Sequence, residues 1–193
     1  TLPGFDPAQF ANRDDFRALR IEPYLLYTAG RHPDLATGIT ALADALYVSS
    51  IALVHGDVSP KNIIFRAQGP VLLDAECATM GDPVFDVAFC LNHLVLKAVH
   101  LPAIRSALLA SIGAFWASYA PAVNWEPAAA LETRVIALLP ALMLARVDGK
   151  SPVEYLTEPS RDIVRRAGRA LFIDHAPTLD AFVVRLQAEL AAS

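Results

Sequence analysis

The stretch LVHGDVSPKNIIFRAQGPVLLDAECATMGDPVFD, residues 53–86, contains most of the polar chemistry in this sequence. It places three oxygen-bearing side chains at fixed spacing: Asp57 in His-Gly-Asp, Asn62 five residues later, and Asp74 after an apolar run. One carboxylate can position a nucleophile, while an amide and a second carboxylate can hold a divalent cation. The pattern predicts a phosphoryl-transfer site, because that chemistry depends on positioning and on neutralising phosphate charge.

Two short apolar runs flank a turn inside this stretch. Residues 62–65 and 71–73 are predicted to be strands, joined by a turn at residues 68–70. Such a hairpin would bring Asn62, at the start of one strand, next to Asp74, at the end of the other. The two side chains would then be placed to share one ion.

Composition is typical of a globular protein. The 193 residues correspond to one domain, and 54% of them are hydrophobic, which is enough for a large core. The net charge of −4 argues against nucleic acid as the main partner, because a phosphate backbone attracts a basic face. Cys77 and Cys90 lack metal-ligand spacing, so we expect two reduced, buried thiols in a cytoplasmic protein.

No segment has the pattern of a signal peptide or a membrane span. The start, TLPGFDPAQFANRDDF, is polar and acidic. The longest uncharged run lies between Arg105 and Glu126 and contains Pro121 and Asn124. We interpret it as a buried helix followed by a loop, without contact with a membrane.

Helical patterns fill the rest of the chain. Pro3, Gly4 and Pro7 predict a linker over residues 1–12. Pro23 is expected to begin a new helix at a first-turn position. Further helices are predicted at about residues 34–50, 83–100, 102–119, 127–147 with a kink or break at Pro140, 159–172 and 178–190.

LVHGDVSPKNIIF and LLDAECATMGDPVFDVAF resemble the aminoglycoside phosphotransferase and choline kinase family, small-molecule kinases with a protein-kinase-like fold. The spacing matches the kinase pattern H-R-D-x-x-x-x-N, with Gly56 in place of Arg. The resemblance implies a mainly α fold with a small β-hairpin (α+β), the C-terminal lobe of a protein-kinase-like phosphotransferase.

The resemblance also implies a role for each matching position. Asp57 would be the catalytic base, and Asn62 and Asp74 would be ligands of Mg²⁺, with ATP as the phosphoryl donor. The catalytic loop would be supported structurally by His55, Asp82 and Asp86.

Ser59, Lys61 and Glu76 are candidates for cofactor binding. Ser59 stands where protein kinases carry a lysine that touches phosphate, and Lys61 either approaches the transferred phosphate or is an exposed loop residue. Glu76 either contacts the metal through water or is a polar residue after a strand. Glu76 and Asp82 are also candidates for a carboxylate-rich wall that would suit a cationic or hydroxylated substrate.

Two features outside the motif have both a structural and a functional interpretation. His93 lies among leucines on a predicted helix, which favours a core or boundary histidine over a site residue. The segment from Arg146 to Lys150 is interpreted as a helix end with cations against the helix dipole. The alternative is that it faces a substrate pocket.

The family also has an N-terminal lobe with a nucleotide-covering loop and a strand lysine. The only lysines here are Lys61, Lys97 and Lys150, and no G-x-G-x-x-G occurs. We therefore expect residues 1–12 to be a linker from an N-terminal lobe outside this sequence, and residues 13–193 to be a helical catalytic lobe with little activity alone.

The sequence predicts an ATP-dependent phosphotransferase that acts on a hydroxyl of a small molecule. The alternative is a catalytically silent kinase-like module that binds nucleotide or another ligand. A metal-dependent hydrolase using the same cluster is disfavoured, because no histidine-rich or two-metal ligand set accompanies it.

Overall fold

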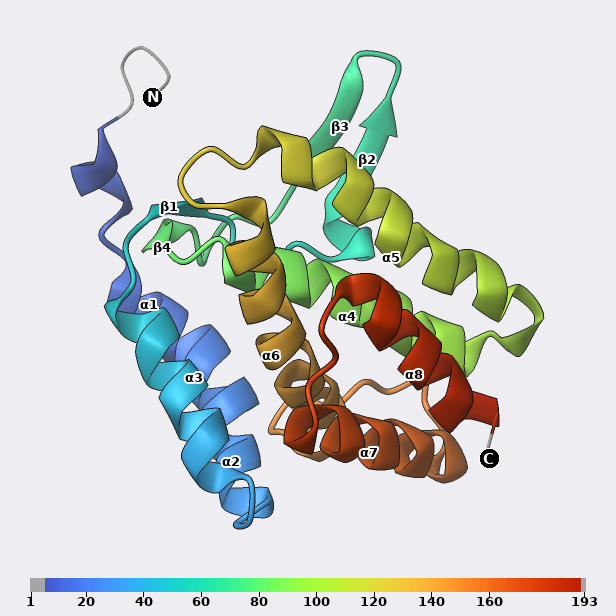
Figure 1. Cartoon of the computed structure of the whole chain (residues 1–193). Helices are drawn as coiled ribbons and strands as arrows, with labels where there is room; N and C mark the ends of the chain where they lie inside the picture. The colour runs from blue at the N-terminus through green and yellow to red at the C-terminus, as the bar shows by residue number, and fades with distance from the viewer. Residues whose placement is uncertain (1–5, 192–193) are drawn as a thin grey trace.

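The segments with a helical repeat in the sequence form a bundle, and two small antiparallel strand pairs lie at one end of it (Figure 1). The computed structural model describes residues 6–191. In chain order the elements are η1 (Pro7–Phe10), α1 (Arg13–Phe16), the π-helix η2 (Arg17–Leu26), α2 (Tyr27–Arg31), α3 (Ala36–Val48), β1 (Ala52–Val54), η3 (Pro60–Asn62), β2 (Ile63–Arg66), β3 (Gly69–Leu72), β4 (Thr79–Gly81), α4 (Val84–His100), η4 (Pro102–Ile104), α5 (Arg105–Tyr119), η5 (Ala120–Ala122), α6 (Ala128–Asp148), α7 (Glu158–Ile173) and α8 (Leu179–Ala191).

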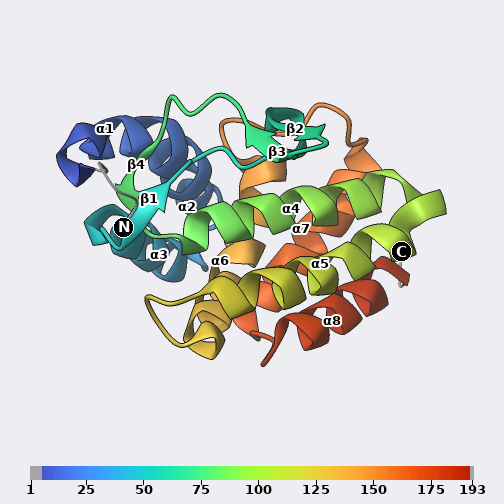
Figure 2. The same ribbon diagram turned by 90° about the horizontal axis from the view of Figure 1, so that it is seen from above.

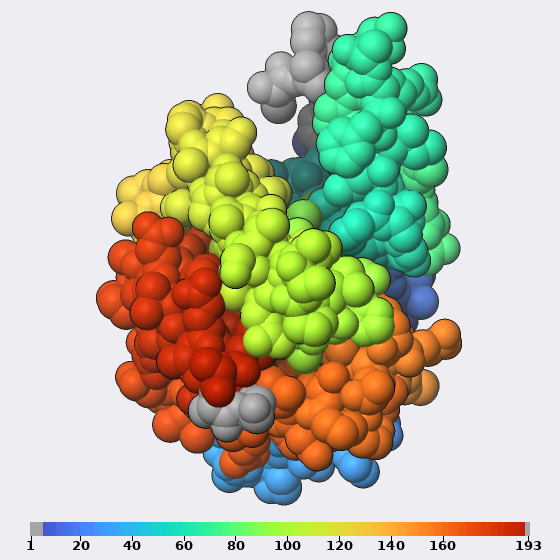
Figure 3. Space-filling model, turned by 90° about the vertical axis from the view of Figure 1, so that its right-hand side faces the viewer, coloured from blue at the N-terminus to red at the C-terminus, as the bar shows by residue number. Residues whose placement is uncertain are grey.

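The predicted hairpin is present as β2 and β3, but its turn lies at residues 67–68 and not at 68–70, because Gly69 and Pro70 pair within β3. Asn62 is the last residue of η3, directly before β2. Their register runs from Ile63 opposite Leu72 to Arg66 opposite Gly69. The hairpin stands above the helical body (Figure 3). A second pair, β1 with β4, was not expected, because its strands are three residues each and lie far apart in the sequence.

Helix α4 is the centre of the core and crosses the middle of the bundle (Figure 2). It packs against α5 on one side and α6 on another, and α6 packs against α7. Phe85 and Phe89 are buried on α4 and stack on each other at 5.4 Å, while Phe16 meets Phe85 edge-on at 4.9 Å. Burial of each ring stabilises the fold by roughly 2–3 kcal/mol. The loops next to α4 are therefore attached to a well-packed helix.

Pro23 does not begin a helix, so that prediction was wrong. It lies inside η2, a π-helix of ten residues. Proline has no backbone N–H, so the i→i−5 hydrogen bond of a π-helix, which would run from residue 23 to the carbonyl of Ala18, cannot form. Nearby, the Arg20 side chain donates to the Leu19 carbonyl at 3.0 Å, and Lys150 N donates to the Pro23 carbonyl at 3.0 Å.

Pro140 likewise lies within α6 and does not end it. By length and composition α6 is the one single helix in residues 6–191 that could cross a membrane, and 61% of its most apolar window is buried inside the protein. The uncharged run before Glu126 forms α5 followed by the short η5, but only Leu109 and Ile112 of α5 are buried, so the helix is less buried than predicted. Cys77 is buried, Cys90 is half-buried, and both are free thiols.

Residues 7–12 lie against β4. Of the predicted linker, residues 1–5 lie outside the described residues, and η1 is capped by the Asp6 side chain, which accepts from Ala8 N. Thr79 donates its hydroxyl to the Phe10 carbonyl, and Asn12 donates its amide to the Ala78 carbonyl. The division of the chain at residue 12 stays a prediction.

Candidate active site

The carboxylate of Asp86, in the first turn of α4, anchors the loop that follows β1. Asp86 accepts hydrogen bonds from the backbone of His55, at 2.6 Å, and of Gly56, at 2.8 Å. Burial raises the pKa of Asp86, although these two amides act in the opposite direction. The side chain therefore fixes the loop to the core helix, in the position expected for a brace.

Gly56 needs to be glycine for two reasons. Its backbone φ is +80°, a value that residues other than glycine rarely adopt. A Cβ built at this position would lie 2.8 Å from Cys77 Cβ. The loop therefore has no room for the arginine that protein kinases carry at this position.

Asp57 is buried next to two cations. Arg20 Nη2 lies 3.3 Å from its Oδ2 and Lys61 Nζ lies 3.6 Å from the same oxygen. The Asp57 amide donates to His55 Nδ1 at 3.2 Å, which places the proton of a neutral imidazole on Nε2. Arg20 also donates Nε to the Gly56 carbonyl, so it holds both the loop and its carboxylate.

Asn62 and Asp74 lie at the open end of the hairpin. The Asn62 side chain donates Nδ2 to the Asp57 carbonyl at 3.1 Å, and none of the hydrogen bonds among residues 6–191 uses its Oδ1. Leu73 N donates to the Asn62 carbonyl at 2.8 Å, so Asp74 follows directly beside Asn62. Asp74 has a φ of 65° and is exposed, with no ion pair or hydrogen bond among the described residues.

The charges of this region act on one buried thiol. The pKa of Cys77 is raised first by burial, and the carboxylates of Glu76, Asp57 and Asp74 raise it further. The Arg20 guanidinium opposes them. Because a Coulombic effect falls off with distance, these groups gather around Cys77.

The oxygen donors fit a magnesium ion that is also held by phosphate. No group of three or more His, Cys, Asp or Glu side chains among residues 6–191 forms a ligand set. Mg²⁺ is usually bound by one or two carboxylates together with phosphate oxygens and water. The unengaged Oδ1 of Asn62 and the unpaired carboxylate of Asp74 supply that smaller number, with Glu76 exposed two residues further on.

Asp82 does not contribute to a carboxylate-rich wall. It is buried, accepts from Val84 N at the start of α4, and forms an ion pair with Arg134, which also pairs with Glu126. This side chain therefore joins α4 to α6. Glu76 does not line the large cavity described next, so the expected wall is absent there.

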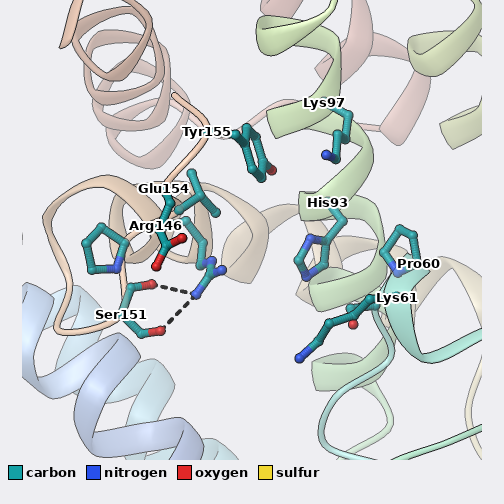
Figure 4. Close-up of a pocket in the computed structure, with 11 residues that line it drawn as sticks. Pro60, Lys61, His93, Lys97, Arg146, Ser151, Glu154 and Tyr155 are labelled. Atoms are coloured by element: carbon teal, nitrogen blue, oxygen red, sulfur yellow. Dashed lines mark hydrogen bonds between the residues drawn. The ribbon is translucent and has the colours of Figure 1, made fainter. Parts of the chain in front are cut away.

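A cavity of about 680 Å³ opens between the catalytic loop, α4 and the segment after α6 (Figure 4). Ser59 and Lys61 line it from the loop, and Ser59 is fully buried with a hydroxyl that has no partner among residues 6–191. The remaining lining residues are Pro60, His93, Lys97, Arg146, Ser151, Pro152, Val153, Glu154 and Tyr155.

Two of these residues had an open interpretation in the sequence. His93 lines the cavity, although its ring also packs edge-on against Phe89 at 5.1 Å. Arg146 lines the cavity and donates to the Ser151 carbonyl and hydroxyl, so it also supports the segment after α6. Lys97 and Tyr155 were missed, because only the packing of α4 against residues 151–155 brings them to one cavity.

A mainly helical lobe with a hairpin beside a His-Gly-Asp loop defines a phosphotransferase of protein-kinase-like fold. This chain belongs to the phosphotransferase enzyme family (APH), whose family model matches residues 3–122, more than half of its length. No curated protein sequence matches the chain. The match contains the loop, the hairpin, α4 and α5, and confirms both the resemblance and the fold class. Arg146 and residues 151–155 lie outside it.

Proposed function

We propose that this protein is an ATP-dependent kinase that transfers a phosphoryl group to a hydroxyl of a small molecule. Family membership establishes a phosphotransferase. The observation that carries the finer proposal is the position of Asp57: its carboxylate lies beside Lys61, which lines the cavity, and its backbone carbonyl accepts from Asn62 at the open end of the hairpin. Asp57 thus lies between the cavity, to which it is linked by Lys61, and the end of the hairpin, to which it is linked by Asn62.

Each residue has a chemical task in this proposal. Asp57 orients the acceptor hydroxyl and takes its proton, and Arg20 keeps the carboxylate in place. Lys61, with 70% of its side chain exposed, is free to reach an incoming phosphate. Asn62 and Asp74 would hold Mg²⁺, which supplies charge neutralisation on the phosphates when bound.

The proposal extends to a nucleotide-covering lobe that packs on the hairpin. Apolar side chains on and next to β2 and β3 are exposed: Phe65 is 83% exposed, Leu72 49% and Leu73 42%. A second lobe of the same gene product would cover them. This lobe is also the expected source of the lysine and loop that hold the nucleotide.

The experiment measures ADP production by the gene product that contains this chain, with Mg-ATP and a panel of small alcohols. Asp57→Ala is expected to lower the rate about 100- to 10,000-fold, the range for loss of a general base. Asp74→Ala is expected to lower it strongly and to raise the Mg²⁺ requirement. Asp44→Ala, which removes an exposed carboxylate on α3, is the matched control. Normal turnover by Asp57→Ala would rule out the mechanism and favour the silent binding module.

A further inference from the structure

The large cavity has a positive lining in a protein whose net charge is negative. Three lining side chains are cations, Lys61, Lys97 and Arg146, and one, Glu154, is an anion. The whole chain has a formal charge of −4. The cations are therefore concentrated where a ligand can enter, against the trend of the rest of the sequence.

Two of the cations have no carboxylate to neutralise them. The ion pairs of residues 6–191 include neither Lys97 nor Arg146, and they do not include Glu154. Lys97 Nζ instead lies 4.1 Å from the centre of the Tyr155 ring, and Arg146 Nη1 donates to Tyr24 Oη at 3.1 Å. Aromatic neighbours position a cation without cancelling its charge.

Unsatisfied polar atoms accompany these charges. The Tyr155 hydroxyl and Arg146 Nε are buried and have no hydrogen-bond partner among residues 6–191. Buried polar groups are usually paired, and an exception often marks a missing ligand or water. In Figure 4, Lys97 and Tyr155 face each other at one end of the cavity, while Lys61 lies at the other.

His93 lies between the two ends of the cavity (Figure 4), and its pKa reflects the charges around it. Burial lowers its pKa to about 4, and Arg146, Lys61 and Lys97 all act in the same direction. Three cations therefore act on one ring, and only Asp57 opposes them. A neutral imidazole remains available to donate or accept a hydrogen bond.

We propose that this cavity binds an anionic acceptor, a hydroxylated small molecule with a carboxylate or a phosphate. The anionic group lies between Lys97, Arg146 and Tyr155, and the hydroxyl points toward Lys61 and Asp57. A volume of about 680 Å³ suits a molecule of sugar-acid or sugar-phosphate size. This assignment rests on the proposed kinase function and replaces the cationic acceptor that a carboxylate wall would have favoured.

The test compares four probes with one carbon skeleton: glucose, glucosamine, gluconate and glucose 6-phosphate. Isothermal titration calorimetry measures their affinity for the protein without nucleotide. Gluconate or glucose 6-phosphate is expected to bind at least about tenfold more tightly than glucose and glucosamine, and less tightly as salt is raised. Whichever of gluconate and glucose 6-phosphate binds more tightly shows whether the site prefers a carboxylate or a phosphate. Equal or tighter binding of glucosamine, or no binding of either anion, would overturn the proposal.

Variants assign the binding to the cavity. Lys97→Gln and Arg146→Gln are expected to weaken anion binding about tenfold or more, the usual loss for a charge-assisted hydrogen bond. Glu154→Gln is expected to strengthen it, a direction that misfolding cannot produce. Lys150→Gln is the matched control, because Lys150 is an exposed cation in the same segment that does not line this cavity. Unchanged anion binding in both Lys97→Gln and Arg146→Gln would overturn the proposal.

The readouts separate this inference from the kinase proposal. If gluconate binds through Lys97 but no alcohol is phosphorylated, the anion site stands and the kinase function fails. If a neutral or cationic alcohol is phosphorylated and neither anion binds, the kinase function stands and the anion site fails. Competition by Mg-ADP for the bound anion would mean that the cations serve the nucleotide, and it would also overturn the inference.

Discussion

Arg20 on the π-helix lies 3.3 Å from the carboxylate of Asp57, and the two side chains are each about 10% exposed. The pair joins the N-terminal helices to the catalytic loop across 37 residues of sequence, and Arg20 also donates to the Gly56 carbonyl. A buried carboxylate that loses its partner keeps its desolvation cost. Arg20 is therefore a positioning residue for Asp57.

Replacing Arg20 is expected to reduce both stability and phosphoryl transfer. Arg20→Gln leaves Asp57 buried without its guanidinium and should lower the free energy of unfolding by about 3 kcal/mol, measured by urea denaturation. Arg17→Gln is the control, because Arg17 pairs with Glu22 on the surface of the same helix. If the two variants unfold at the same urea concentration, the Arg20–Asp57 pair stabilises the fold no more than the exposed Arg17–Glu22 pair does.

The raised pKa of Asp86 gives stability a defined pH dependence. A carboxyl group whose pKa is higher in the folded than in the unfolded state stabilises the fold below its unfolded pKa, about 4. That contribution is lost as pH rises through the folded-state pKa. The difference in unfolding free energy, wild type minus Asp86→Asn, is therefore expected to fall as pH rises above about 4.

The control for this measurement is Asp44→Asn, which changes an exposed carboxylate on α3. Its difference from wild type should stay constant over the same pH range. A difference for Asp86→Asn that grows with pH would mean that the two loop amides outweigh burial, contrary to the direction of the pKa shift.

A pair of glycine substitutions tests the geometry of the loop. Gly56→Ala puts a Cβ 2.8 Å from Cys77 Cβ at a positive φ, and is expected to cost about 1–3 kcal/mol. Gly30→Ala, inside α2 with no atom within 4 Å of the added Cβ, should be neutral or stabilise by about 0.5–1 kcal/mol. Thermal unfolding of both variants checks the contrast, which a stable Gly56→Ala protein would contradict.

His93 should stay neutral across the physiological pH range. Its pKa of about 4 lies below the unfolded value of about 6.5, so its contribution to stability is present above pH 6.5 and is lost as pH falls toward 4. Proton NMR of the ring should show no titration between pH 5.5 and 8. His93→Gln should flatten the loss of stability in acid. An inflexion near pH 6.5 for the His93 ring would contradict the described environment.

Local sequence patterns were enough to predict the hairpin and most helices. The apolar runs at residues 62–65 and 71–73 predicted the hairpin, although Gly69 and Pro70 belong to β3 and not to the turn. The helices α7 and α8 begin and end within one residue of the predicted bounds. The motif also places Asn62 beside Asp74, because both lie at one end of the same hairpin. These features depend on residues that are near in sequence.

Features that depend on distant contacts were not predictable in the same way. No sequence motif marks Arg20 as a site residue. Its pairing with Asp57 arises only because η2 packs against the loop that contains Asp57. The strand β4 forms because β1, 25 residues earlier at the nearest register pair, lies beside it. Pro23 lies inside η2, and its carbonyl accepts from the backbone of Lys150, which is far away in the sequence.

Helix α4 runs unbroken from Val84 to His100, with the brace Asp86 in its first turn and Lys97 near its end. The part of this helix that lines the cavity runs from His93 to Lys97, a separation of four residues that spans about 6 Å along the axis. The helix therefore fixes how far the ammonium group of Lys97 lies from the loop end of the cavity. Acceptors would be sorted by reach as well as by charge, since a molecule too short to bridge that span can satisfy only one end at a time.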